Sequence, residues 1–151
     1  MIVYAESSAV LSWLLAEPRG VEAARVLESA DVIVASVLTG IECSRAIVRG
    51  VQLGALTRGD ARVISEALAR AELGWHRMEV SDRVMIRARI PFPAEPVRSL
   101  DAIHLASALV AHEAYRGVTM VSFDERIRAN AEQLGMMVLP SEPRSSSPSA
   151  A

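Results

Sequence analysis

Apolar residues along this chain form two alternating kinds of segment. Short uninterrupted apolar runs, such as IVYA at 2–5 and VIVA at 32–35, are typical of strands buried on both faces of a sheet. Between these runs, apolar residues recur at helical spacing. The predicted strands cover 1–5, 32–35, 118–122 and 136–139, with 75–80 a strand or an extended segment. The predicted helices cover 8–15, 18–30, 39–50, 57–73, 82–88, 100–115 and 124–135. This alternation predicts an α/β/α three-layer domain with a mostly parallel sheet.

Polar and special residues mark the expected helix ends. Pro18 suits the first turn of the second helix, and Thr39 is expected to open the third. Thr57 and Asp60 form a variant capping box, with Asp in place of the usual Glu. Gly135 is a good residue to terminate the last helix.

Length and composition favour one soluble domain. The domain is expected to span 1–139, and the Ser- and Pro-rich segment 140–151 is expected to be a disordered tail. A single cysteine, Cys43, excludes an internal disulfide framework, and its apolar helical setting favours a core residue over a nucleophile. No apolar run is long enough for a membrane span, and no signal-peptide pattern is present, so we expect a cytoplasmic protein that has no membrane partner.

Four acidic residues interrupt apolar runs, where an unpaired charge is costly to bury. Most other acidic residues have an Arg within one helical turn, as Glu22 has Arg25, and are typical of a solvated helix surface. The four exceptions are Glu6, Glu42, Asp101 and Asp124. Their shared setting, in segments far apart in sequence, suggests one common site in which a cation offsets the crowded negative charge.

The predicted elements bring these four carboxylates to the same edge of the sheet. Glu6 and Asp124 each lie just past a predicted strand, whereas Glu42 and Asp101 lie early in predicted helices. In open parallel sheets, ligands bind outside the carboxyl ends of the strands. We therefore expect all four side chains at that edge.

Clustered carboxylates favour Mg²⁺ or Mn²⁺ over Zn²⁺. The three histidines lack the spacing of a zinc motif, and no cysteine pair exists. A hard cation with open coordination positions fits metal-assisted hydrolysis of a phosphodiester bond. Neither a GxSxG nucleophile elbow nor a glycine-rich phosphate loop is present. The net charge of −2 gives no global attraction to nucleic acid, so any such substrate would depend on local patches.

The segments YAESSAVL, SLDAIHLASAL and VSFDERI, in this order, resemble the PIN-domain family, in particular the VapC-type ribonuclease toxins of type II toxin–antitoxin systems. The resemblance implies a PIN fold and a Mg²⁺- or Mn²⁺-dependent endoribonuclease acting on RNA. It implies catalytic and metal-binding roles for Glu6, Glu42, Asp101 and Asp124, with Ser122 and Ser8 as supporting hydroxyls. It also implies a homodimer and a small cognate antitoxin that blocks the acidic site.

Glu6 departs from the family pattern, which usually has Asp at this position in a DTSA-like motif. Glu keeps the charge but is longer by one methylene, so the rate or the metal preference could change. Two readings therefore stay open: a nuclease, or a PIN-like binding module that has weak or lost catalysis. A third class, phosphotransfer through an Asp nucleophile, is disfavoured because the first predicted strand is followed by Glu-Ser-Ser.

Three residues near the acids have two readings each. Arg45 could pair with Glu42, three residues earlier, offset crowded negative charge and also meet a phosphate. Arg98 could contact a phosphate or be a solvated loop residue. His104 shares a helix face with Asp101, and a hydrogen-bonded structural role is favoured over metal ligation.

Overall fold

The computed structural model describes residues 1–141 and has a central sheet of parallel strands. The strands are β1 (Ile2–Ala5), β2 (Val32–Ser36), β3 (His76–Met78), β4 (Thr119–Val121) and β5 (Val138–Leu139), in the spatial order β3-β2-β1-β4-β5. From β1, the chain adds β2 and β3 on one side of the sheet and then β4 and β5 on the other. The switch point between β1 and β4 is therefore where a ligand site is expected in an α/β sheet.

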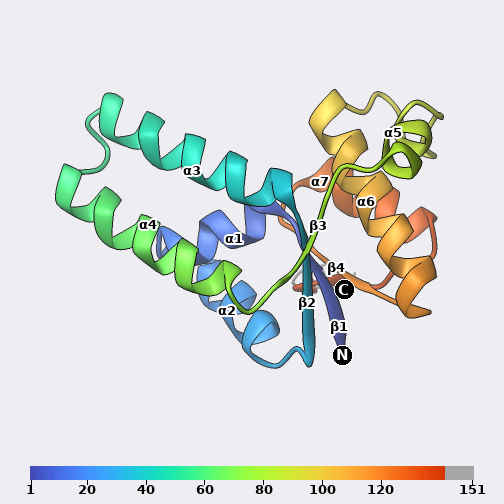
Figure 1. Cartoon of the computed structure of the whole chain (residues 1–151), viewed down its shortest axis with the longest axis horizontal. Coiled ribbons are helices and arrows are strands. Elements are labelled where there is room, and N and C mark those ends of the chain that lie inside the picture. The colour runs from blue at the N-terminus through green and yellow to red at the C-terminus, as the bar shows by residue number, and fades with distance from the viewer. Residues whose placement is uncertain (142–151) are drawn as a thin grey trace, which may run out of the picture.

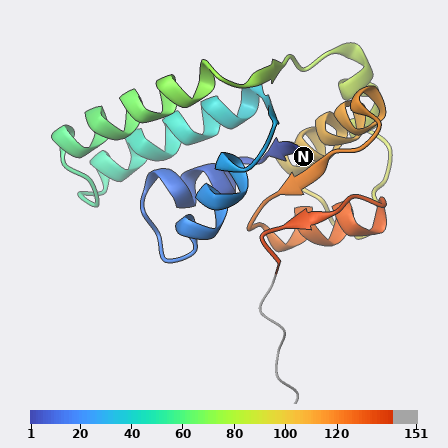
Figure 2. The same ribbon diagram turned by 90° about the horizontal axis from the view of Figure 1, so that it is seen from below.

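Helices cover both faces of this sheet, as the hydrophobic pattern predicts (Figure 1). One face carries α1 (Ser7–Leu14), α2 (Gly20–Glu28), α3 (Val37–Gln52) and α4 (Arg58–Glu72), and the other carries α5 (Asp82–Ala88), α6 (Ser99–Tyr115) and α7 (Glu125–Gln133). Figure 2 shows α3 and α4 side by side as an antiparallel pair that projects beyond the sheet. The three-layer α/β/α prediction is confirmed.

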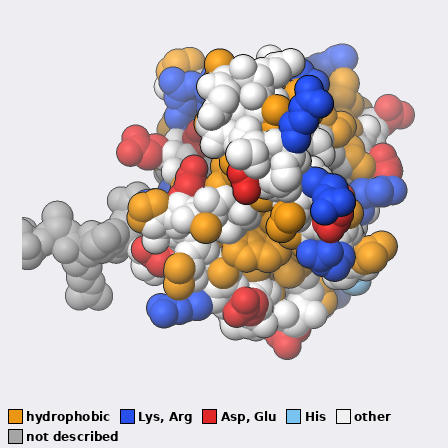
Figure 3. Space-filling view, turned by 90° about the vertical axis from the view of Figure 1, so that its left-hand side faces the viewer, with side chains coloured by type: hydrophobic (Ala, Val, Ile, Leu, Met, Phe, Trp, Pro, Cys, Tyr) orange, Lys and Arg blue, Asp and Glu red, His pale blue; other side chains and the backbone are white. Residues whose placement is uncertain are grey.

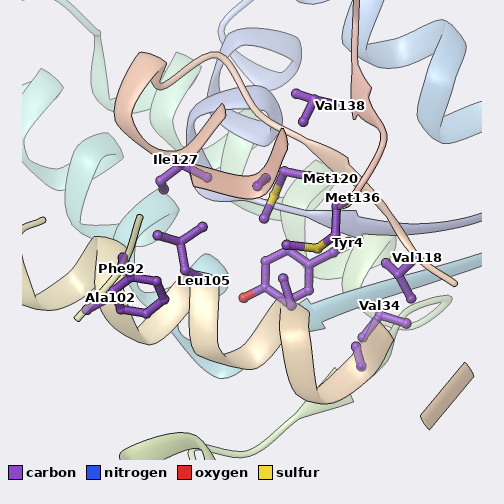
Figure 4. Close-up of a cluster of buried hydrophobic side chains, with 13 residues drawn as sticks. Tyr4, Val34, Phe92, Ala102, Leu105, Val118, Met120, Ile127, Met136 and Val138 are labelled. Atoms are coloured by element: carbon purple, nitrogen blue, oxygen red, sulfur yellow. The ribbon is translucent and has the colours of Figure 1, made fainter. Parts of the chain in front are cut away.

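Each face of the sheet has its own hydrophobic core. Tyr4 and Met120 pack with Leu105 and Ile127 on the α6–α7 side (Figure 4). Val3 and other side chains of β1 and β4 pack against α1, α2 and α3 on the opposite side. Successive residues of a strand point to opposite faces, so a strand between two cores needs an uninterrupted apolar run.

Two predicted helix starts are wrong by two residues. Helix α3 begins at Val37, not Thr39, because the Ser36 hydroxyl accepts a hydrogen bond from the Leu38 amide (3.2 Å). Thr39 is buried instead and donates to the Ala5 carbonyl (3.1 Å), which ties α3 to the end of β1. Helix α2 begins at Gly20, not at Pro18. A Cβ added at Gly20 would stand 2.2 Å from the Ser12 carbonyl oxygen. Close packing of α1 on α2 thus requires this glycine.

Other local signals act as predicted. The Thr57 hydroxyl accepts from the Asp60 amide (3.1 Å) and the Asp60 carboxylate accepts from the Thr57 amide (3.0 Å), which completes the capping box of α4. Gly135 has φ +84° just after α7. Of the predicted tail, 140–151, the part after Ser141 lies outside the described residues. Within residues 1–141, no helix combines the length and the apolar character that crossing a membrane requires.

Candidate active site

The four predicted carboxylates lie at the carboxyl ends of β1 and β4 and at the helix starts beside them. Glu6 follows β1 and is the N-cap residue of α1, and Asp124 follows β4 and is the N-cap residue of α7. Glu42 lies in the second turn of α3, and Asp101 lies in the first turn of α6. Hydrogen bonds divide the four into two pairs: Glu6 with Glu42, and Asp101 with Asp124.

Glu6 is a buried carboxylate, 3% exposed, that protein donors surround. Its Oε1 accepts from the Ser7 hydroxyl (2.7 Å) and the Ser8 amide (3.1 Å). Its Oε2 accepts from the Ser122 hydroxyl (2.7 Å) and from the Ser8 hydroxyl. Hydrogen-bond donors on Ser7, Ser8 and Ser122 thus compensate the burial of this carboxyl group.

Ser8 and Ser122 connect Glu6 to the second pair of acids. Both hydroxyls, which donate to Glu6, also accept from the Asp124 amide, at 3.2 Å for Ser8 and 3.0 Å for Ser122. The Asp124 carboxylate in turn caps α7 by accepting from the Arg126 and Ile127 amides (2.9 and 3.1 Å). The two predicted supporting hydroxyls therefore lie between the β1 and β4 ends, although their contribution to activity stays a prediction.

Ser7 bridges Glu6 and Glu42. Its Oγ lies 2.7 Å from Glu6 Oε1 and 2.7 Å from Glu42 Oε2. A hydroxyl has one proton, so it can donate to only one of these oxygens at a time. At the carboxylate oxygen that does not receive this proton, a lone pair of Ser7 Oγ faces a lone pair of the carboxylate at 2.7 Å. An additional proton or a cation would relieve this crowding.

His104 joins Glu42 to the core. Its Nε2 lies 2.6 Å from Glu42 Oε2, and its Nδ1 lies 2.9 Å from the Tyr4 hydroxyl. A carboxylate only accepts, so Nε2 donates to Glu42, and in the neutral ring Nδ1 accepts from Tyr4. The Tyr4–His104–Glu42 chain thus fixes the position of the Glu42 side chain from inside the protein.

These contacts also set the ionisation of Glu42. Partial burial by itself raises the pKa of this carboxyl, but hydrogen bonds from His104 and Ser7 and the nearby positive charge of Arg98 outweigh burial. The net result is a pKa below the ordinary value, so Glu42 is an anion at neutral pH.

Arg98 holds the second pair of acids. It is the N-cap residue of α6, so Ser99 begins that helix and does not cap it. The Arg98 Nε donates to Asp101 Oδ2 (2.8 Å) and its Nη2 donates to Asp124 Oδ2 (3.1 Å). Arg98 is exposed but is not a free loop residue, because one guanidinium bridges acids from two helices.

The donor set fits a hard divalent cation. Potential ligand atoms of Glu6, Glu42 and His104 all lie within 4.8 Å of one another, the one such group among residues 1–141, although both ring nitrogens of His104 are already hydrogen-bonded. Asp101 and Asp124 stand outside this tight group and are held by Arg98. Carboxylate oxygens suit Mg²⁺ or Mn²⁺. A bound cation would also reduce the repulsion between the oxygens of Ser7, Glu6 and Glu42.

Sequence reasoning missed the contribution of Ser7, for which the doubled serine of the ESSA segment was a usable signal. The hydrogen-bonded structural role favoured for His104 agrees with its contacts to Tyr4 and Glu42. No ion pair among the described residues joins Arg45 to Glu42, but both residues line the same groove beside Ser7. Arg45 therefore reaches the site's border and not its centre.

Cys43 is a core residue, as predicted. Burial, with the negative charges of Glu6 and Glu42, raises the pKa of its thiol to about 12. Its Sγ lies 4.0 Å from the Ser7 carbonyl oxygen on the buried side of α3. A thiol that stays protonated is not a nucleophile.

The fold and the site together define the class: an α/β protein whose acidic centre lies at the topological switch point of a parallel sheet. The chain belongs to the PIN domain family, whose family model matches residues 3–133. The predicted membership is confirmed.

Named relatives support this membership. The chain is 32% identical to Ribonuclease VapC35 of Mycobacterium tuberculosis over 140 residues, covering 91% of this chain and 96% of that protein. It is 33% identical to Ribonuclease VapC46 of the same organism, covering 91% and 95%. PAE2754 from Pyrobaculum aerophilum has a similar crystal structure, with a TM-score of 0.58 at 17% identity, covering 91% of this chain and 89% of that one. This last likeness concerns the fold alone.

Proposed function

We propose that this protein is a Mg²⁺- or Mn²⁺-dependent endoribonuclease, the toxin of a toxin–antitoxin pair. The observation that carries the proposal is the convergence of Glu6, Glu42, Asp101 and Asp124, from four different elements, at one edge of the sheet. Relatives named as ribonucleases, which match nearly the whole length of the chain, support the same activity.

In this proposal the carboxylates hold the cation and the neighbouring residues orient them. Glu6 and Glu42 would provide ligands from one side, and Asp101 and Asp124 from the other. When bound, the cation would activate a water molecule for attack on a phosphodiester and stabilise the charge that develops. Ser8, Ser122 and His104 keep the first pair in position through the hydrogen bonds described above.

A polar groove that Glu42 lines supports a path for the RNA strand toward the site. The groove has a volume of about 350 Å³ and begins at Ser7 and Glu42. Arg45 and Arg49 line it further along α3, and neither is engaged in an ion pair within the described part of the chain. Arginine side chains without a carboxylate partner are suited to phosphate oxygens.

The decisive test is cleavage of structured RNAs by the purified protein with Mg²⁺ or Mn²⁺. Asp101→Asn should reduce the rate by about 100-fold or more, the scale of losing one group that stabilises charge in a reaction. Asp82→Asn is the matched control, because Asp82 is an exposed acid in the first turn of α5. Cleavage in EDTA, or an unchanged rate for Asp101→Asn, would contradict the proposal.

A PIN-like binding module is the second candidate. The observation that favours it is the engagement of Glu6, whose two oxygens already accept three hydrogen bonds from Ser8 and Ser122 and lie within reach of the Ser7 hydroxyl. A carboxylate engaged in this way could serve the fold more than a metal. Full RNA binding without metal-dependent cleavage would be the signature of this candidate.

Partners follow from the same proposal. We propose a small antitoxin that blocks the acidic site, a homodimer, and a location in the cytoplasm. Exposed apolar side chains suitable for a protein partner occur along the α3–α4 hairpin, at Ile41, Val48, Leu53 and Val63. Figure 3 views the molecule from the side toward which this hairpin projects, and apolar and basic side chains are both exposed on that face.

A further inference from the structure

Arg98 is placed where a cation would be expected in the proposed site. Its side chain folds over the first turn of α6, and its Nε and Nη2 both face Asp101, at 2.8 Å from Oδ2 and 3.4 Å from Oδ1. The same Nη2 reaches Asp124 Oδ2 at 3.1 Å. The planar guanidinium thus contacts two carboxylates that lie 23 residues apart in sequence, on different helices.

Burial differs between the partners. The Asp101 side chain is 10% exposed and that of Asp124 is 26% exposed, whereas that of Arg98 is 64% exposed. The acids are therefore fixed in the protein, and Arg98 reaches them from the solvent side. The guanidinium can withdraw without opening the hydrophobic core.

The same oxygens cannot serve both cations fully. Asp101 Oδ2 and Asp124 Oδ2 are the acceptors of the two shorter Arg98 bonds, and a metal ion between these acids would use oxygens from the same carboxylates. A bound divalent cation would also repel a guanidinium a few ångströms away.

We propose that Arg98 is a built-in counter-ion, which holds Asp101 and Asp124 together when no metal is bound and which must release at least one of them when a metal enters. The inference rests on the proposed function, because it takes these acids as metal ligands. Arg98 is thus a positioning residue that stabilises the metal-free protein and lowers its affinity for the cation. It acts through the two carboxylates and not on the substrate.

The test is calorimetric titration of the full chain with Mn²⁺ alone, without RNA. Removal of the competing charge in Arg98→Gln should tighten Mn²⁺ binding about tenfold, since two charges interacting at such distances in an exposed site gain or lose about this factor. Arg98→Lys keeps the charge but loses the planar guanidinium that contacts both acids. Its dissociation constant for Mn²⁺ should therefore lie between those of the wild type and Arg98→Gln.

Thermal unfolding gives an independent readout. In EDTA, Arg98→Gln should melt at a lower temperature than the wild type, because Asp101 and Asp124 lose their shared counter-ion. In saturating Mn²⁺ this deficit should disappear. Arg62→Gln is the matched control: Arg62 is an exposed arginine paired with Glu66 (3.9 Å) on α4, so the variant has the same net charge but should change neither property.

The outcomes separate the two proposals. If the wild type binds Mn²⁺ and Arg98→Gln binds it equally or more weakly, Arg98 is not a competitor and only this inference is overturned. If Arg98→Gln fails to fold in EDTA, Arg98→Lys decides in its place, and an unchanged affinity in that variant overturns the inference. If the wild type binds no Mn²⁺, both the inference and the metal-dependent function are overturned.

Discussion

At the scale of single residues, Glu6 is the most informative position. The serine hydroxyls and the Ser8 amide around it are spaced for a glutamate, since they meet both of its carboxylate oxygens. Glu6→Asp would withdraw the carboxylate by one methylene and break part of this arrangement. We expect metal-dependent RNA cleavage to fall by about 10- to 100-fold, the usual cost of displacing a reacting group by about 1 Å.

The measurement is the cleavage rate of Glu6→Asp beside that of Glu28→Asp, an exposed glutamate at the end of α2. A large gain of activity in Glu6→Asp would contradict the interpretation that the surroundings of Glu6 are adapted to it. Such a gain would instead indicate that glutamate weakens a site suited to aspartate.

Residue identity revealed part of this site and not the rest. That the four acids share one sheet edge could be predicted, because a carboxylate in an apolar run is unusual and can be recognised from the sequence; their catalytic and metal-binding roles stay a prediction. The role of Ser7 and the partner of His104 could not be predicted, because serine and histidine are ordinary in apolar helices and the Glu42 that both contact lies 35 and 62 residues away. Arg98 lies three residues before Asp101, which hinted at that ion pair but gave no sign of Asp124.

At the scale of elements, α3 connects the acidic site to the groove. Glu42, Arg45 and Arg49 line the same groove, at helical spacing along α3. At 1.5 Å per residue, the two arginines lie about 4.5 and 10.5 Å along the axis from Glu42. Helix α3 therefore places two positive charges, Arg45 and Arg49, at successive points along the proposed path of the RNA.

We expect Arg45→Gln and Arg49→Gln each to weaken binding of a single-stranded RNA. Each variant should reduce the slope of log affinity against log salt by about 0.7, the value for one phosphate contact on a single strand. Fluorescence anisotropy in EDTA measures binding without cleavage. Arg70→Gln, on α4 and outside the groove lining, should leave the slope unchanged. Equal slopes in all of the variants would contradict an RNA path along α3.

Element order was predictable, and element boundaries were less so. Runs of β-branched residues and capping signals such as Thr57 are local, so they can be read directly. Thr39 looked like a cap because threonine favours caps, but the structure uses its hydroxyl to bond Ala5 across the sheet edge. Tertiary contacts of this kind override local preference.

At the scale of the whole molecule, the site is made of elements from both layers of helices. A cation that binds the native protein and not the unfolded chain must therefore stabilise the entire fold. At about 100 times its dissociation constant, Mn²⁺ should add about 2.7 kcal/mol. For a domain of this size, we expect the melting temperature to rise by about 5–10 °C.

Differential scanning calorimetry with Mn²⁺, and with NaCl at equal ionic strength, checks this expectation. Asp101→Asn should show a much smaller rise, whereas Asp82→Asn should behave like the wild type. An equal rise in NaCl would mean general screening of charge and not binding at the site.

The three layers could be predicted from alternation of strands and helices, but the strand order could not. The order β3-β2-β1-β4-β5 depends on the pairing of β1 with β4, whose partners Tyr4 and Met120 are far apart in sequence. Nothing in the local pattern of either strand specifies this pairing.

That pairing has a consequence for protein synthesis. Glu6 emerges from the ribosome well before its partner Ser122 and before Asp124, which are made only after α6 and β4. Domains generally fold as units, so a nascent chain that ends before β4 cannot complete the acidic edge. If the protein is a nuclease, a nascent chain acquires that activity only once β4 and Asp124 have been synthesised.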